Sequence, residues 1–238
     1  MFNRLKILAW SVHLFTASGM IVGFKALEMA YTGQTYQAIM WLLLAVFIDG
    51  IDGTFARLFK VKEILPTMDG KMIDFVVDFV NFVITPTVIF YHEKMVPNTL
   101  LFPAVAGILI ASLYHYGNKN QVTSDYRFIG FPAFWNLIIY YLFILRMDEF
   151  FNLLVICVFI LLHFLPVKFL YISRLRINII LTAFTLIVLL TANTIVLLNY
   201  PTISVEMRLF AVIPLLVLFI LGMINQEIFP SLALNKKK

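Results

Sequence analysis

The sequence predicts an all-α, polytopic integral membrane protein built as a bundle of about eight transmembrane helices. Of its 238 residues, 62% are hydrophobic and only 13% are charged, and the mean hydropathy is +0.94. Soluble domains contain roughly 45–50% apolar and about 25% charged residues, so this composition excludes an ordinary soluble domain. The single cysteine, Cys157, excludes a disulfide framework, a zinc cluster of cysteines and a redox pair within one chain.

Eight apolar segments have the length of a membrane-spanning helix, which needs about 20 apolar residues with a range of about 17 to 25. The first segment is too long and too rich in polar residues for a signal peptide, so we expect it to be retained. Connections are short and no repeat or soluble domain interrupts the series, so we predict one membrane domain over residues 1–238. The predicted spans are residues 7–29, 36–57, 71–92, 98–116, 129–146, 150–167, 177–198 and 207–227.

The basic residues predict the orientation of the spans. All but four of the 18 lysines and arginines fall at the two termini or in alternate connections. By the positive-inside rule this side is cytoplasmic, so both termini are predicted to lie in the cytoplasm, in agreement with an even number of spans. The predicted cytoplasmic residues are Arg4, Lys6, Arg57, Lys60, Lys62, Lys71, Lys119, Arg127, Lys168, Arg174, Arg176, Lys236, Lys237 and Lys238, and those opposite are Lys25, Lys94, Arg146 and Arg208.

Acidic residues are concentrated in one short part of the chain. Of the 13 acidic residues, six lie between residues 49 and 78. Four of these six, Asp49, Asp52, Asp74 and Asp78, are embedded in apolar sequence. An aspartate at the centre of a membrane helix costs about 2.5–3.5 kcal/mol, so the cluster indicates a functional site.

Helical spacing places the four aspartates on two stripes. Asp49 and Asp52 are three residues apart near the end of the second span, and Asp74 and Asp78 are four residues apart near the start of the third. Because adjacent spans are antiparallel, we expect the four carboxylates to converge toward the cytoplasmic side. Oxygen ligands without nearby His or Cys favour Mg²⁺, Mn²⁺ or Ca²⁺, and buried aspartates also suit the ion or proton site of a transporter.

These acids, with the small and basic residues beside them, resemble the DxxDGxxAR…GxxxDxxxD signature of the CDP-alcohol phosphotransferases. Twelve residues separate the two halves of the signature, more than in most members. This longer gap, the GFPAFWN stretch at residues 130–136 and the eight predicted spans are similar to the bacterial phosphatidylcholine synthases. The matching residues are Asp49, Asp52, Gly53, Ala56, Arg57, Gly70, Asp74 and Asp78.

The resemblance implies that CDP-diacylglycerol and choline react to give phosphatidylcholine and CMP, with Mn²⁺ or Mg²⁺, in the inner (cytoplasmic) membrane of a bacterium. Serine, glycerol phosphate and inositol phosphate remain alternative acceptors, and ion-coupled transport remains an alternative function. Relatives often form dimers, so the resemblance points to a homodimer, and no nucleic acid is expected as a partner.

The resemblance also assigns roles to single residues. It implies that Asp49, Asp52 and Asp74 are metal ligands. Asp78 would complete the metal site and act as the base that takes the hydroxyl proton. The implied contacts to the nucleotide or diphosphate are Asp52, Gly53, Ala56, Arg57 and Gly70.

Aromatic residues on the predicted cytoplasmic side are the candidates for binding choline. A quaternary ammonium cannot donate a hydrogen bond, so proteins hold it against aromatic faces, each worth about 0.5–2 kcal/mol. Aromatic residues also gather at membrane interfaces, and that explanation applies to each candidate taken singly. The candidates are Tyr114, Tyr116, Tyr126, Phe134 and Trp135, with Asn136 as a polar contact.

Overall fold

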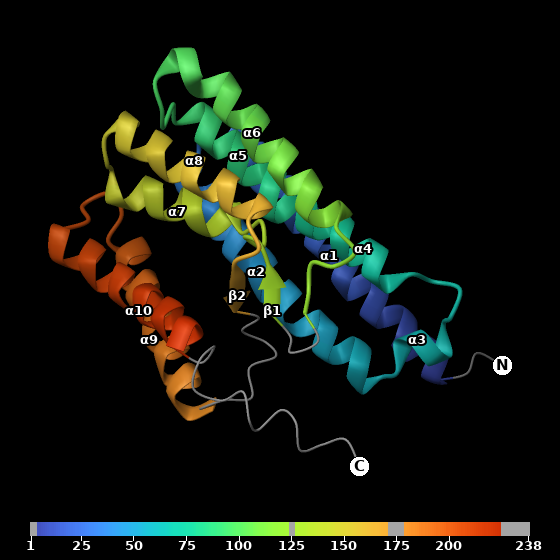
Figure 1. Cartoon of the computed structure of the whole chain (residues 1–238). Helices are drawn as coiled ribbons and strands as arrows, with labels where there is room; N and C mark the ends of the chain where they lie inside the picture. Colours follow the sequence, from blue (N-terminus) through green and yellow to red (C-terminus); the bar gives the residue numbers. More distant parts are fainter. Residues whose placement is uncertain (1–3, 124–126, 171–178, 225–238) are drawn as a thin grey trace. The chain divides into compact units, whose positions relative to one another are not determined.

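The computed structural model describes residues 4–123, 127–170 and 179–224, and these residues are mostly helical (Figure 1). The chain falls into two compact units, one of Met1–Asn118 with Ala133–Phe164 and one of Lys119–Pro132 with Leu165–Lys238. The predicted helical class is confirmed, with the correction that a small two-stranded sheet accompanies the helices. A single domain stays a prediction.

The first unit is a set of helices. Its elements are α1 (Arg4–Tyr31), α2 (Thr35–Leu58), α3 (Val61–Ile64), α4 (Gly70–Asp78), the π-helical turn η1 (Phe79–Ile84), α5 (Thr85–His92), α6 (Asn98–Gly117), α7 (Trp135–Leu145) and α8 (Glu149–Phe164). The elements α4, η1 and α5 follow one another without a break and form one helix over Gly70–His92.

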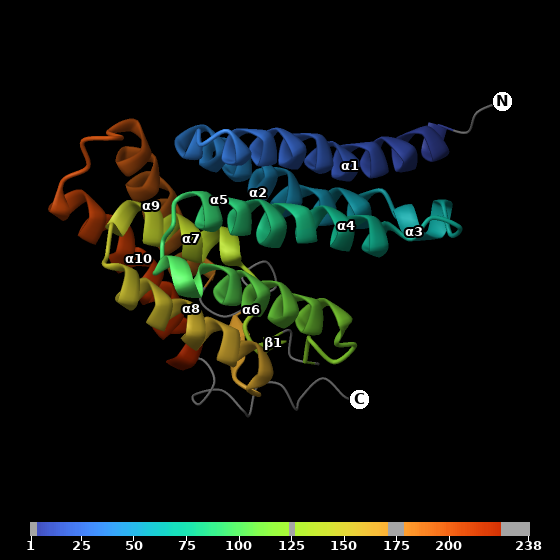
Figure 2. The same cartoon turned by 90° about the horizontal axis from the view of Figure 1, so that it is seen from above.

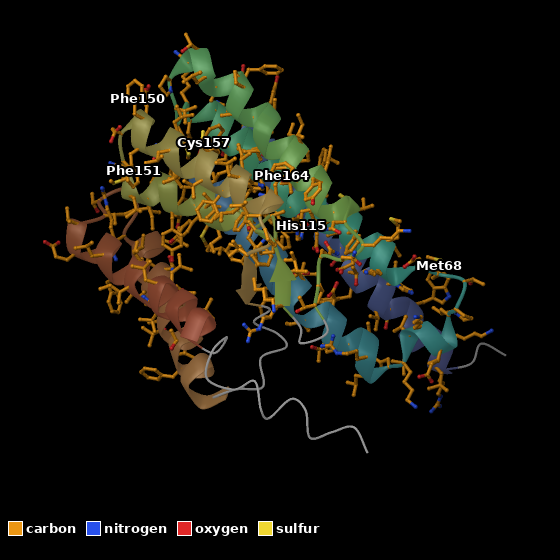
Figure 3. All side chains as sticks on the ribbon, in the orientation of Figure 1. Met68, His115, Phe150, Phe151, Cys157 and Phe164 are labelled. Atoms are coloured by element: carbon orange, nitrogen blue, oxygen red, sulfur yellow. The ribbon has the colours of Figure 1, made fainter. Side chains whose placement is uncertain are left out.

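Within the described residues, four helices are long and apolar enough to cross a membrane by length and composition: α1, α2, Gly70–His92 and α6. They match the first four predicted spans to within a few residues. Large apolar side chains such as those of Phe47 and Phe102 are exposed on them. Cys157 on α8 is also exposed (Figure 3). Exposed apolar surface of this kind is typical of a protein that contacts lipid.

Small residues allow α1 to pack closely against its neighbours. α1 contacts α2 most extensively and also contacts α3, α4, η1 and α5, so it adjoins both helices that carry the acidic cluster (Figure 2). Small side chains at helix interfaces let backbones approach, and this packing drives helix association in membranes. The buried residues of α1 are Ala9, Val12, His13, Thr16, Gly19, Gly23, Ala26 and Ala30.

The helix Gly70–His92 changes its winding directly after Asp78. The backbone N–H of Thr85 donates to the carbonyl oxygen of Val80, five residues earlier rather than four. Pro86 follows at the start of α5, and in an α-helix its ring would clash with the carbonyl four residues before it. The wider turn of η1 relieves that clash, and π-helical turns are common at functional sites.

The second unit contains the sheet. β1 (Arg127–Ile129) pairs antiparallel with β2 (Lys168–Leu170), so that Phe128 lies opposite Phe169. In the same unit α9 (Ile179–Leu198) packs against α10 (Val205–Ile224).

The predicted fifth span, residues 129–146, needs a correction. Residue 129 belongs to β1, and the helix α7 begins only at Trp135. Gly130 adopts a positive φ of 78°, and Pro132 lacks the N–H that a continuing helix would use. Five of the predicted cytoplasmic basic residues lie outside the described residues: Arg174, Arg176, Lys236, Lys237 and Lys238.

Candidate active site

Three aspartates from two neighbouring helices converge on one point. Asp49 lies on α2, and Asp74 and Asp78 lie one turn apart on α4. Each offers one carboxylate oxygen, and the three oxygens all lie within 4.8 Å of one another. The spacing of four residues on α4 places its two acids on one face, as the sequence predicts.

Asp49 and Asp78 interact directly within this cluster. Their carboxyl groups are close enough to hydrogen-bond to each other. Two ionised carboxylates at such a separation repel, so a proton or a cation must lie between them. This pair therefore gives the cluster a strong affinity for positive charge.

Asp52 is not one of the three converging acids. Its side chain is buried and interacts with the hydroxyl of Thr16 on α1. It remains close enough to Asp49 and Asp74 to repel both electrostatically. The predicted convergence of four carboxylates is thus seen for three, with Asp52 drawn toward α1.

The donor set fits a hard divalent cation. Carboxylate oxygens suit Mg²⁺, Mn²⁺ and Ca²⁺. Mg²⁺ binds oxygen at about 2.0–2.1 Å and Ca²⁺ at about 2.3–2.6 Å, so oxygens bound to one ion lie at most roughly 4–5 Å apart. The oxygens of Asp49, Asp74 and Asp78, all within 4.8 Å, meet this requirement.

Gly53 and Arg57 lie one turn apart on α2, beside Asp52. Arg57 is exposed and donates a hydrogen bond from Nη2 to the hydroxyl of Thr54 at 3.1 Å, and its charge attracts Asp52. A Cβ added at Gly53 would lie 3.3 Å from Nη1 of Arg57. The missing side chain at Gly53 therefore leaves the guanidinium close to the helix, near the acids.

Gly70 begins α4 in contact with α1. A Cβ at this position would lie 2.9 Å from Cε1 of His13, so only glycine fits without a shift. The side chain of Asp69 caps the helix by accepting hydrogen bonds from the backbone N–H groups of Lys71 and Met72, both at 3.1 Å. The start of α4 is thereby fixed against α1.

The long connection between α2 and α4 is also attached to α1. Val61 of α3 and Leu65 are buried against Ala9 and Val12 of α1. Ala56, predicted to leave room for the nucleotide, packs partly buried against the same apolar cluster. The extra length of the connection therefore forms a small apolar contact rather than a free loop.

Tyr116 is the aromatic candidate that the structure places beside the acids. Its side chain is close enough to Asp49, Asp74 and Asp78 for an electrostatic interaction with each. The rings of Phe75 and Phe79, which directly follow Asp74 and Asp78, meet its ring nearly at right angles at 5.6 and 5.5 Å.

The other aromatic candidates on α6 and α7 have different surroundings. Tyr114 is exposed and packs against Phe164 of α8, with ring centroids 4.9 Å apart (Figure 3). Trp135 is fully buried, stacks on His163 at 5.4 Å and donates its indole N–H to the hydroxyl of Ser112 at 2.8 Å.

Three further candidates complete the set. Phe134 meets Phe82 edge-on, with ring centroids 6.1 Å apart. Asn136 is half-buried at the start of α7. Tyr126 lies outside the described residues. A choline-binding role for any of these residues stays a prediction.

A comparison with known families identifies the chain. The model of the CDP-alcohol phosphatidyltransferase family matches residues 10–165, which include the whole acidic cluster. The protein belongs to the CDP-alcohol phosphatidyltransferase family.

Several similar members of the CDP-alcohol phosphatidyltransferase family are phosphatidylcholine synthases. The enzyme of Borreliella burgdorferi is 37% identical over 168 residues, which cover 71% of this chain and 72% of the relative. That of Pseudomonas aeruginosa is 37% identical over 171 residues, or 72% of each chain. That of Legionella pneumophila is 39% identical over 169 residues, or 70% of this chain and 66% of the relative.

Two polar residues of α1 lie next to residues of the family signature, although the sequence did not single them out. Thr16 contacts Asp52, and His13 faces Gly70. Both are buried on the small-residue stripe of α1, three residues apart. A buried polar pair on an otherwise small-residue stripe is the signal that could have found them.

Proposed function

We propose that this protein is a phosphatidylcholine synthase, which transfers the phosphatidyl group of CDP-diacylglycerol to choline and releases CMP. The observation that carries the proposal is the convergence of three carboxylate oxygens within 4.8 Å on the family's signature helices. The relatives that bear the name phosphatidylcholine synthase support choline as the acceptor.

The acidic cluster would hold Mn²⁺ or Mg²⁺, in our proposal two ions. Asp49, Asp74 and Asp78 would supply the converging ligands, and Asp52 would join them when it leaves Thr16. When bound, divalent ions offset the negative charge on the phosphate oxygens during the displacement.

Asp78 would act as the base. The choline hydroxyl is a poor nucleophile while protonated, so a group beside it must take the proton. As Asp78 takes this proton, the choline oxygen forms a bond to the lipid-linked phosphorus. The bond from that phosphorus to the bridging oxygen breaks, and CMP leaves with the bond's electrons.

The first half of the signature, together with Gly70, would hold the nucleotide. Arg57 is exposed, and its guanidinium would pair with a phosphate oxygen. Gly53 and Gly70 would let the nucleotide approach the backbone. The proposed contacts are Asp52, Gly53, Ala56, Arg57 and Gly70.

Choline would bind at Tyr116. The phenol ring lies beside the acids, so a quaternary ammonium on its face would also meet negative charge. Nζ of Lys71 lies 5.0 Å from the ring centroid of Phe75, and this cation–π contact beside the acids supports the proposal.

For the membrane arrangement we propose eight spans in the inner membrane of a bacterium, with both termini and the acidic cluster toward the cytoplasm. The distribution of basic residues supports this orientation. We propose a homodimer as the assembly.

The test is an assay of CMP release by the purified protein in the presence of CDP-diacylglycerol and a panel of alcohols. We expect release only when an alcohol is supplied, with choline the best substrate and phosphatidylcholine the product. Preference for serine, glycerol phosphate or inositol phosphate would overturn the acceptor while keeping the chemistry. No release with any alcohol, combined with cation-driven solute uptake in vesicles, would indicate a transporter.

A further inference from the structure

Gly19 of α1 lies between the two helices that carry the acidic cluster. A Cβ built at Gly19 would lie 2.9 Å from Cγ1 of Val77 and 3.7 Å from Cγ2 of Ile48. Both of these side chains are buried. In the sequence, Ile48 directly precedes Asp49 and Val77 directly precedes Asp78. The residues that directly precede the two acids therefore both lie next to the same glycine.

Asn81, in the π-helical turn, also contacts Gly19. Its side chain is 1% exposed and donates a hydrogen bond from Nδ2 to the carbonyl oxygen of Gly19 at 3.2 Å. A Cβ at Gly23 would overlap Oδ1 of Asn81, so the amide group of Asn81 occupies the space that a side chain at Gly23 would need.

The contact of Gly19 with Val77 affects where Asp49 and Asp78 lie relative to each other. Side chains in a packed helical core transmit small displacements because few voids absorb them. A methyl group at Gly19 must displace Val77, and Val is stiff because its χ1 is restricted in a helix. The displacement of Val77 would shift Asp78, the next residue on α4, relative to Asp49 on α2.

We propose that Gly19 and Asn81 form a clasp that sets the separation of Asp49 and Asp78 and thereby the affinity of the acidic cluster for a divalent cation. Both are positioning residues, since neither touches the cation. The inference rests on the proposed function only in requiring that the cluster bind such a cation.

The test measures Mn²⁺ binding to the full chain in nanodiscs by electron paramagnetic resonance, which needs no catalytic activity. We expect Gly19→Ala and Asn81→Leu to weaken Mn²⁺ binding by about tenfold or more. Turnover of both variants should return toward that of the parent protein at saturating Mn²⁺, because the catalytic groups are intact. If Asn81→Leu does not fold, Gly19→Ala, the smaller change, decides the result.

Two variants elsewhere in the first unit provide matched controls. Gly107→Ala adds the same methyl group between α6 and α8, 2.7 Å from Cδ1 of Ile160. Asn152→Leu removes a buried amide that donates to the carbonyl oxygen of Met95 at 2.8 Å, as Asn81 does to that of Gly19. We expect both controls to lower the melting temperature and to bind Mn²⁺ like the parent protein.

The outcomes separate the clasp from the metal site. If Asp78→Asn weakens Mn²⁺ binding but Gly19→Ala and Asn81→Leu do not, the clasp is wrong and the metal site stands. Equal weakening in the controls and the clasp variants also overturns the clasp, because general loosening then explains the effect. If the parent protein binds neither Mn²⁺ nor Mg²⁺, the proposed clasp and the proposed metal site are both wrong.

Discussion

The rings of Tyr116 and Phe79 meet at 84° with their centroids 5.5 Å apart. Phe79 directly follows Asp78, and this edge-to-face contact is a favoured arrangement of aromatic rings. Tyr116 comes from α6 and Phe79 from η1, so the contact joins the two segments beside the acids. It holds the phenol next to the group that is proposed to take the proton from choline.

The first prediction concerns Tyr116. Removing the aromatic face with Tyr116→Leu should raise the KM for choline about tenfold, within the roughly 2- to 30-fold that one cation–π contact allows. The KM for CDP-diacylglycerol should change little. Tyr116→Phe keeps the ring and should have a smaller effect. Tyr114→Leu serves as the comparison, and a larger effect there would place the choline site on the other side of α6.

The second prediction concerns Asp78. Asp78→Asn keeps the size of the side chain but cannot take a proton, so turnover should fall by about 10²–10⁴-fold. Binding of CDP-diacylglycerol, measured by equilibrium dialysis, should fall much less. Asp69→Asn is the matched control, because asparagine caps a helix as well as aspartate does. Substantial turnover by Asp78→Asn would remove this residue as the base.

The third prediction concerns the cation. A chelator should abolish CMP release, because three carboxylates that are left to repel one another cannot hold the diphosphate. Added Mn²⁺ or Mg²⁺ should restore the release. Full activity in excess chelator would end the metal hypothesis, and a heat-inactivated sample sets the background.

The fourth prediction compares two glycines near the acids. Gly70→Ala places a methyl group 2.9 Å from Cε1 of His13 and should reduce turnover several-fold by shifting the start of α4. Gly50→Ala has no neighbouring atom within 4 Å and should leave turnover unchanged. Turnover that responds equally to both changes would show that the contact with α1 is unimportant.

The fifth prediction concerns stability alone. Gly33 has a positive φ of 75°, and a Cβ there would lie 2.7 Å from Cε1 of His92. Gly33→Ala should therefore lower the free energy of unfolding by about 1–3 kcal/mol, seen as a lower melting temperature in detergent. The KM for choline and the affinity for Mn²⁺ should not change, because the change lies far from Asp78 along the helix Gly70–His92. A variant as stable as the parent protein would contradict the prediction.

The helices that begin the chain were readable from the sequence because each is a continuous apolar run of sufficient length. The small sheet was not readable, since Phe128 and Phe169 are distant in the sequence and each strand has only three residues. The π-helical turn was not readable either, because it produces no distinctive spacing of hydrophobic residues in the sequence. Pro86 was its one local signal.

The acidic site was partly readable for a similar reason. The spacing of Asp74 and Asp78 is local, and it fixes their common face. Asp52 points toward Thr16 on α1 instead of joining the other three acids. This contact joins two helices, so the spacing of residues in the sequence cannot reveal it. Tyr114 and Tyr116 lie two residues apart and so point about 200° apart around α6, and only the fold decides which of them faces the acids.

The π-helical turn after Asp78 has a consequence for chain length. It inserts an additional residue into a helix that would otherwise wind evenly from Gly70 to His92. Loss of a single residue between Phe79 and Ile84 would let the winding become regular and turn Asp78 by about 100° relative to α5. Asp74 and Asp78 would then turn away from Asp49, while the span would lose only one of its 23 residues and stay long enough to cross a membrane. Single-residue deletions here should thus yield a well-inserted, inert protein.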